Sequence, residues 1–344
     1  MCHISEAKLQ TLAMSTLIQL LTEEYDLSVT SIIPFTPKNN KYQDTHYFWI
    51  VHTKYSLYFL KKQRYPEQFP IEREAEIMKQ VRGYVAIPKI ILSKNHRASI
   101  TNNGSTYVLY QYIDAPNLLE QGFDTYHYLD VLCVVQNNFI AHNQTAEHHN
   151  FSAKIDHSIT IFRKIHSVLE SNPDNKTKVH DLQYVEFLIS ELHLVKDKLE
   201  SIQVKTCLVH GDLLKQNIII KNDKIWVIDW ERARPYISII DLLRSILYTI
   251  TDQTEADLIL DEETFLQYTL YCFEKVTFHP KEIELAMELL YFHLITNTDY
   301  LANVYLHHRK TVTGRSQADY RICTWFREHK NSLQRSIDNH FAIS

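Results

Sequence analysis

Two short apolar runs near the middle of the chain lead into polar residues that a buried strand does not usually carry. The first run leads into His210-Gly-Asp212 and continues to Asn217, five residues after the aspartate. The second, residues 224–228, is rich in β-branched residues and ends in Asp229. Such runs favour strands. A hairpin whose polar residues only cap turns would need these spacings to arise by chance, so the pattern indicates a functional site.

These three polar side chains match the groups that phosphoryl transfer from ATP requires. One carboxylate accepts the proton of the attacking hydroxyl, while an amide oxygen and a second carboxylate hold Mg²⁺. Protein kinases place their catalytic Asp and their Asn at the same five-residue spacing, with a metal-binding Asp on a following strand. We therefore predict Asp212 as the base, and Asn217 and Asp229 as metal ligands. His210 is expected to fix the turn rather than take part in the chemistry.

A lysine at the end of a predicted strand completes this set of groups. Lys61 and Lys62 end the strand, and a lysine there can reach the α- and β-phosphates as a point charge. Because side chains alternate along a strand, only one of the two can face the nucleotide, and we favour Lys61. The next predicted helix offers Glu72, Glu74 and Glu76 as partners for that lysine.

Composition restricts the class of protein. With 344 residues, 45% of them apolar and 22% charged, the chain can form two lobes or domains. Its net charge of −5 argues against nucleic-acid binding, and no run of eighteen apolar residues predicts a membrane span. The N-terminus lacks the pattern of a secretory signal, and the five scattered cysteines read as reduced thiols. We expect a cytoplasmic protein without a zinc site.

The order of predicted elements indicates an α+β fold with two lobes. Residues 1–113 form the first, an antiparallel sheet with a single helix laid on it and a preceding helix; the larger lobe, 114–344, is mainly helical and carries the catalytic and metal motifs. The elements of the first are a helix at 6–25, strands at 28–35, 47–52 and 56–60, a helix at 66–82, and strands at 98–101 and 105–112. Beyond the key strands, helices are predicted at 124–146, 152–170, 181–204, 239–252, 262–275, 280–305 and 316–338.

A nucleotide is expected in the cleft between these lobes. The joining peptide would meet the adenine through main-chain atoms of Gln111 and Ile113. Arg232 and Arg234 follow the metal-binding aspartate and could meet an anionic acceptor, but they could equally be exposed. Asp241 would cap a helix or brace the loop.

Glu231 leaves two readings open. It could contact substrate or an arginine, and a surface or turn role is equally compatible with its position after Asp229.

Several motifs together resemble the aminoglycoside phosphotransferase/choline-kinase-like superfamily. The resemblance implies a protein-kinase-like fold, ATP and Mg²⁺ as cofactors, a small-molecule hydroxyl as acceptor, and Glu74 as the partner of Lys61 with Glu76 as the alternate. Within it, the layout and the last helix look most like the bacterial spore-coat kinase-like proteins. The motifs are His210-Gly-Asp-Leu-Leu-Lys-Gln-Asn217, Val227-Ile-Asp-Trp-Glu231, Asp241-Leu-Leu, Tyr58-Phe-Leu-Lys61, Arg73-Glu-Ala-Glu-Ile-Met78, Tyr107-Val-Leu-Tyr-Gln-Tyr-Ile113 and Ile165-His166.

Two segments depart from the superfamily's pattern. The loop at 34–44, expected to cover the phosphates, has no glycine, although Asn39 or Asn40 could substitute in part; the segment 213–216 lacks the usual His-Pro-Gly type turn. Only five glycines occur in the chain, and neither Gly-rich phosphate-loop motif is present. These departures leave open an alternative: a catalytically weak kinase-fold protein with a structural role, such as a spore-coat component with assembly partners.

Overall fold

The computed structural model describes residues 6–36, 47–83, 85–142, 144–171, 176–251, 260–308 and 315–343. Contacts divide the chain into two compact units. The first unit comprises Met1–Gly122 with Lys215–Ala233, and the second comprises Phe123–Leu214 with Arg234–Ser344. The lobe boundary expected from the sequence, between residues 113 and 114, remains a prediction. Each unit is described by itself.

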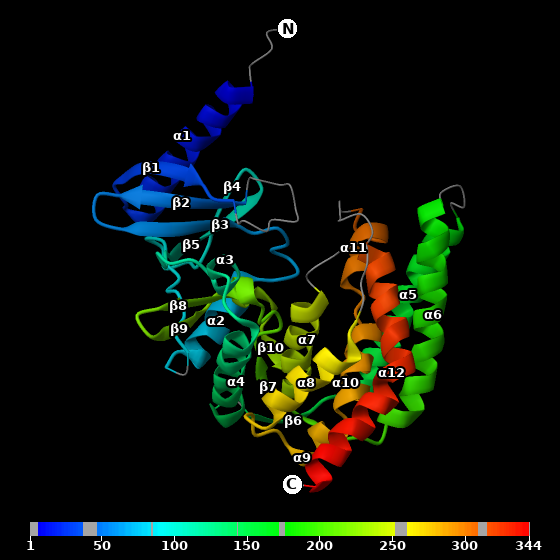
Figure 1. Cartoon of the computed structure of the whole chain (residues 1–344). Coiled ribbons are helices and arrows are strands. Elements are labelled where there is room, and N and C mark those ends of the chain that lie inside the picture. The colour runs from blue at the N-terminus through cyan, green and yellow to red at the C-terminus, as the bar shows by residue number, and fades with distance from the viewer. Residues whose placement is uncertain are drawn as a thin grey trace. The chain divides into compact units, whose positions relative to one another are not determined.

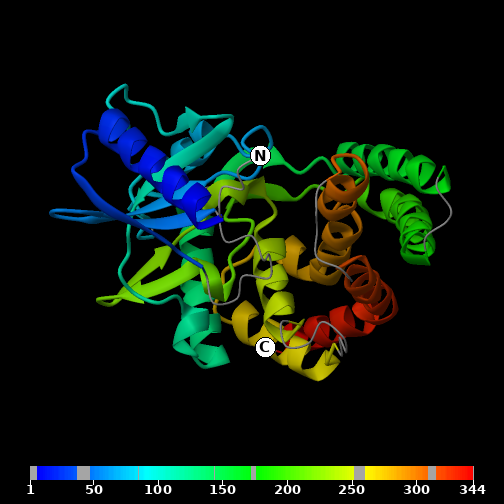
Figure 2. The same cartoon turned by 90° about the horizontal axis from the view of Figure 1, so that it is seen from above.

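The first unit is built on a five-stranded antiparallel sheet, as the sequence predicts. Its strand order is β1-β2-β3-β5-β4, and the helix α1 (Glu6–Tyr25) lies across one face (Figure 2). Fully buried side chains from both layers, among them Leu21, Val51, Leu60 and Leu109, form the core between them. The strands are β1 (Val29–Pro34), β2 (Phe48–Thr53), β3 (Leu57–Lys62), β4 (Ile100–Asn102) and β5 (Ser105–Gln111).

The single helix predicted after the third strand is α2 (Ile71–Val81), and it is shorter than expected. It begins after Pro70 rather than at residue 66, because Pro70 has extended backbone (ψ 132°) and serves as the N-cap. Its buried face carries Ile71, Met78 and Val81 together with one carboxylate, that of Glu74. An ionisable side chain on the apolar face of an amphipathic helix needs a partner.

The remaining elements of the first unit come from two other parts of the chain. The strands β8 and β9 form an antiparallel hairpin in which Ile218 lies opposite Val227. Trp230 is fully buried after this hairpin, and its indole N–H donates to the Val227 carbonyl over 2.8 Å. The elements are α3 (Leu118–Gln121), η1 (Lys215–Asn217), β8 (Ile218–Lys221), β9 (Lys224–Val227) and η2 (Trp230–Arg232).

The second unit combines a small antiparallel sheet with many helices (Figure 1). The strand β7 (Lys205–Val209) lies between β10 (Arg234–Tyr236) and β6 (Gln144–His148). Two long helices, α5 and α6, lie side by side in both Figures 1 and 2. The helices are α4 (Thr125–His142), α5 (Phe151–Glu170), α6 (Lys176–Leu199), α7 (Ser238–Thr251), α8 (Glu262–Phe273), α9 (Pro280–Glu284), α10 (Ala286–Ile295), α11 (Asp299–Tyr305) and α12 (Arg315–Ile343).

Three helix predictions in this unit were wrong in extent. The helix expected at 124–146 ends at His142, because residues 144–148 pair with β7 as a strand. The helix expected at 181–204 is α6, shifted toward the N-terminus. The helix expected at 280–305 is three helices, separated at Leu285, whose φ of −111° is not helical, and again near Thr298. The predicted α+β fold class, with an antiparallel-sheet part and a mainly helical part, is confirmed. Within the described residues, no helix combines the length and apolarity that crossing a bilayer requires.

Candidate active site

The lysine at the end of β3 is the centre of a charged cluster in the first unit. Lys61 Nζ lies 2.6 Å from Asp229 Oδ1 and 2.8 Å from Glu231 Oε2, and only 12% of the lysine side chain is exposed. Lys62 points elsewhere, with its ammonium 6.0 Å from the centroid of the Tyr47 ring. Strand alternation therefore brings Lys61, not Lys62, to the end of the β8–β9 hairpin.

The predicted direct pairing of Lys61 with Glu74 is not formed. The buried carboxylate of Glu74 instead accepts a hydrogen bond of 2.9 Å from the Tyr110 hydroxyl. Tyr110 lies opposite Phe59 on the neighbouring strand, so both side chains share the sheet face of Lys61. Lys61 still feels the charge of Glu74, whereas Glu76 is exposed on the outer face of α2.

The titration behaviour of this cluster follows from its charges. Burial raises the pKa of Glu74 to about 7; the Lys61 charge opposes this, and the Asp229 and Glu231 charges add to it. Burial acts to lower the pKa of the Lys61 ammonium, but the surrounding carboxylates outweigh it and hold that pKa well above its usual value. Three carboxylates face one ammonium here, so up to two negative charges are uncompensated.

The hairpin brings Asn217 and Asp229 to the same end of β8 and β9. The Ile228 N–H donates to the Asn217 carbonyl over 3.0 Å, directly before Asp229. Asp229 has left-handed backbone (φ 65°, ψ 63°), which is uncommon for a residue other than glycine and is often found at functional sites. Asn217 is buried. The Asn217 amide and the Asp229 carboxylate thus belong to residues at the same end of one hairpin.

The donor set of this hairpin fits a hard divalent cation. In the part of the chain that is described, no three His, Cys, Asp or Glu side chains are arranged to enclose a metal ion by themselves. Mg²⁺ seldom needs such an enclosure, because it is usually held by one or two carboxylates and the phosphates of a substrate. The hairpin would supply two carboxylates, those of Asp229 and Glu231, and the amide oxygen of Asn217. The negative charge of the carboxylates favours a cation.

In the second unit, the loop after β7 holds Asp212. The Asp241 carboxylate accepts from the backbone N–H groups of His210 (3.1 Å) and Gly211 (3.0 Å), so it braces the loop, one of its two predicted roles. The His210 ring also fixes the turn, because its Nδ1 accepts from the Asp212 N–H over 3.2 Å. Gly211 has a φ of 77°, which few other residues adopt.

An arginine that the sequence analysis missed holds the Asp212 side chain. Arg244 Nη2 lies 2.7 Å from Asp212 Oδ1, and Nη1 donates to the Gly211 carbonyl. Arg244 follows Asp241 by one turn of α7, so the two face the same loop, and this spacing was the available signal. Tyr110 was also not predicted as a site residue, and the contact of Glu231 with Lys61 is not among the roles left open for it.

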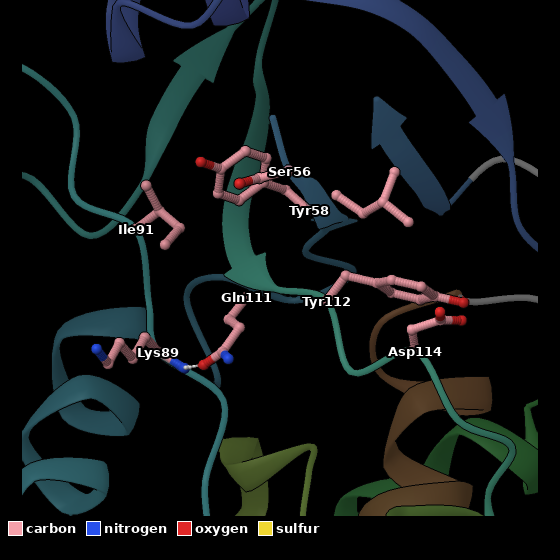
Figure 3. Close-up of a pocket in the computed structure, with 8 residues that line it drawn as sticks. Ser56, Tyr58, Lys89, Ile91, Gln111, Tyr112 and Asp114 are labelled. Carbon is pink, nitrogen blue, oxygen red and sulfur yellow. Dashed lines mark hydrogen bonds between the residues drawn. The ribbon is translucent and has the colours of Figure 1, made fainter. Parts of the chain in front are cut away.

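Of the two residues predicted to meet adenine, Gln111 ends β5 and lines a pocket of about 410 Å³ (Figure 3), and Ile113 follows two residues later. The Gln111 N–H already donates to the Lys89 carbonyl over 2.8 Å, and the Ile113 carbonyl accepts from Ala115 over 2.8 Å. The main-chain contacts of Gln111 and Ile113 with adenine remain predictions. The pocket is lined by Ser56, Leu57, Tyr58, Lys89, Ile91, Gln111, Tyr112 and Asp114. Of the glycine-free loop, residues 37–44 lie outside the described residues.

Comparison with known proteins gives the family and supports the fold. A model of the phosphotransferase enzyme family matches residues 41–270. No curated protein sequence matches the chain. A spectinomycin phosphotransferase solved with ADP and spectinomycin is similar in structure, with a TM-score of 0.56 and 15% identity, covering 94% of this chain and 98% of that one.

Two further solved structures are similar over most of their length. An aminoglycoside phosphotransferase from Alicyclobacillus acidocaldarius has a TM-score of 0.59 and 12% identity, with 93% of this chain and 96% of that one covered. Choline kinase from Streptococcus pneumoniae has a TM-score of 0.57 and 14% identity, with 91% and 97% covered. At these identities the likeness shows the fold, which is that of the protein-kinase-like phosphotransferases.

Proposed function

Since the chain belongs to the phosphotransferase enzyme family, we propose that it transfers the γ-phosphoryl group of ATP to a hydroxyl of a small molecule. The observation that carries this proposal is the ion-paired cluster of Lys61, Asp229 and Glu231 at the end of the β8–β9 hairpin. Phosphoryl transfer depends on positioning and on stabilising negative charge, and an ammonium beside metal-binding oxygens supplies both. ADP and AMP-PNP complexes among similar structures support a nucleotide as donor.

Mg²⁺ is the cation that this donor set would take. Asp229 and Asn217 would hold it, with Glu231 beside them, and the ion would neutralise charge on the phosphates. Lys61 would bind phosphate oxygens as a point charge. Glu74 would hold the lysine through electrostatic attraction rather than through a direct hydrogen bond, because its carboxylate bonds to Tyr110.

Asp212 would accept the proton of the acceptor hydroxyl. Arg244 holds the Asp212 carboxylate at Oδ1 over 2.7 Å, which fixes the orientation in which it would meet that hydroxyl. It would act by orienting the hydroxyl more than by basicity. The acceptor is proposed as a small molecule because the similar proteins include kinases named for spectinomycin and choline.

The narrower resemblance to spore-coat kinase-like proteins remains a prediction from the sequence. The alternative of a structural role, with coat or assembly partners, also remains a prediction from the sequence.

The proposal is tested by thermal unfolding with ATP, with and without Mg²⁺. The variants are Asp229→Asn and, as a matched control, Asp223→Asn in the exposed turn of the same hairpin; both positions have positive φ, which asparagine tolerates. A ligand at 100 times its Kd stabilises the folded state by about 2.7 kcal/mol. We expect a Mg²⁺-dependent rise in Tm for wild type and Asp223→Asn, lost in Asp229→Asn. No rise for wild type would contradict nucleotide binding.

Asp212→Ala separates turnover from binding. We expect this variant to lose transfer and to keep the ATP-dependent rise in Tm, because its carboxylate is assigned to the acceptor and not to the nucleotide. Wild-type turnover in Asp212→Ala would show that the base is another group.

A further inference from the structure

Basic side chains gather in the second unit around the ring of Tyr236. The Arg234 guanidinium carbon lies 4.7 Å from the ring centroid, and the His149 ring packs edge-to-face at 5.1 Å. His293 Nδ1 is 3.2 Å from the Tyr236 hydroxyl. Lys154 stands one turn into α5, which begins two residues after His149. We call Arg234, His149, His293 and Lys154 the basic cluster.

Lys154 and Arg234 bring two basic side chains into the basic cluster. Lys154 and Arg234 are like charges close enough to interact: burial lowers the pKa of Lys154, and Arg234 lowers it further, while the Asp299 carboxylate acts in the opposite direction. With the residues that the structure describes, the half-buried Lys154 ammonium makes neither a hydrogen bond nor an ion pair. An anion bound beside Lys154 would give this ammonium a partner.

His149 adds a polar atom that lacks a partner. Burial and the charges of Lys154 and Arg234 lower its pKa to about 4, so the ring is neutral at pH 7. Its Nε2 is buried and has no hydrogen-bond partner among the described atoms. A buried polar atom without a partner costs free energy, and an N–H at this position would donate to an oxyanion.

The sheet register brings the basic cluster close to Asp212. Arg234 on β10 lies opposite Val209, the last residue of β7. Asp212 is the third residue after Val209, a stretch that spans at most about 10 Å. The Asp241 carboxylate, which braces the same loop, is close enough to feel the charges of both Arg234 and Arg244. A ligand of modest size could therefore meet Asp212 and the basic cluster together.

Arg244 does not add to this preference. Its guanidinium is bound to Asp212, and only 13% of its side chain is exposed, so its charge already has a counter-charge. The preference for an anionic acceptor therefore rests on the basic cluster alone.

We infer that the basic cluster binds the anionic group, a carboxylate or a phosphate, of an acceptor whose hydroxyl is phosphorylated. The inference rests on the proposed function, which defines the acceptor. In that reaction the hydroxyl oxygen bonds to the γ-phosphorus of ATP, and the bond from that phosphorus to the β,γ-bridging oxygen breaks. The hydroxyl proton passes to Asp212, and ADP leaves with the electron pair.

The first test needs no nucleotide. Inorganic phosphate and malonate are titrated by calorimetry against wild type, Lys154→Gln and the matched control Lys164→Gln, whose lysine is exposed on the same helix. We expect Lys154→Gln to weaken binding of the preferred anion about tenfold or more, the worth of one charge-assisted hydrogen bond, and Lys164→Gln to leave it unchanged. Tm values establish that both variants fold. Equal affinities in all three proteins, or no binding to wild type, would overturn the inference.

The second test separates this inference from the proposed function. ADP release is measured with glycerol, glycerate, glycerol 3-phosphate and choline as acceptors, in wild type and Asp212→Ala. Asp212-dependent turnover that favours glycerate or glycerol 3-phosphate supports both proposals and tells a carboxylate from a phosphate. Turnover that favours choline or glycerol overturns the inference and leaves the kinase standing. Anion binding that depends on Lys154, without turnover on any acceptor, supports the anion site and counts against the kinase.

Discussion

The buried carboxylate of Glu74 makes the stability of the protein depend on pH in a way that one substitution isolates. Its pKa in the folded protein is about 7, against an ordinary value of 4.5, so the folded state binds this proton more tightly than the unfolded chain. The stabilisation is complete below pH 4.5 and is lost as the pH rises through 7. At about 1.36 kcal/mol per pKa unit, the difference corresponds to ~3 kcal/mol.

Glu74→Gln removes the proton but keeps an oxygen for the Tyr110 hydroxyl. We expect its free energy of unfolding to increase relative to that of wild type by ~3 kcal/mol between pH 4.5 and pH 8, because only wild type loses stability with the Glu74 proton. Urea unfolding of nucleotide-free protein across this range measures the difference. Glu76→Gln, at an exposed position on the same helix, is the control and should follow wild type throughout. Parallel curves for Glu74→Gln and wild type would refute the assignment of the raised pKa to Glu74.

Three further substitutions test other parts of the structure by the same urea measurement. Tyr110→Phe removes the donor to Glu74, so at pH 8 it should cost about 1–3 kcal/mol; no loss would mean that Glu74 has another donor. Asp241→Ala leaves two backbone N–H groups of the Asp212 loop without their acceptor and should cost ~2 kcal/mol or more, with loss of turnover. Leu60→Ala opens a cavity under α1 and should cost about 2–5 kcal/mol, whereas turnover per folded molecule should persist.

The parts of the fold that were predicted correctly are those with a strong local pattern. Alternation and turn residues gave the five-stranded sheet, including the hairpin at Asn103 and Gly104, where both residues have positive φ. The apolar run at 280–305 contains no local pattern that indicates where its helices end. Its break at Leu285 follows a capping box at His279 and Glu282, and the Glu282 carboxylate also accepts from the Ser238 hydroxyl in a distant helix. Tertiary contacts of this kind override a helical pattern.

The candidate site likewise contains residues that a local pattern predicted and residues that it did not. Alternation favoured Lys61 over Lys62, and only Lys61 reaches the cluster of carboxylates. Its partner could not be read from spacing, because Glu231 lies 170 residues further along the chain. Arg244 was missed for a similar reason: its contact with Asp212 joins two elements that are 32 residues apart. Side-chain pairing across such separations is decided by the fold.

Each unit has one charged cluster that bears on the proposed chemistry. Carboxylates surround the Lys61 ammonium in the first unit, and Lys154 and Arg234 bring basic side chains together in the second. An anionic acceptor repels the triphosphate of ATP, so transfer between the two needs positive charge beside each reactant. The basic cluster would supply it for the acceptor, as Lys61 and Mg²⁺ would for ATP. If the acceptor is anionic, added salt should raise its KM more than it lowers kcat, because salt screens the attraction between the acceptor and the basic cluster.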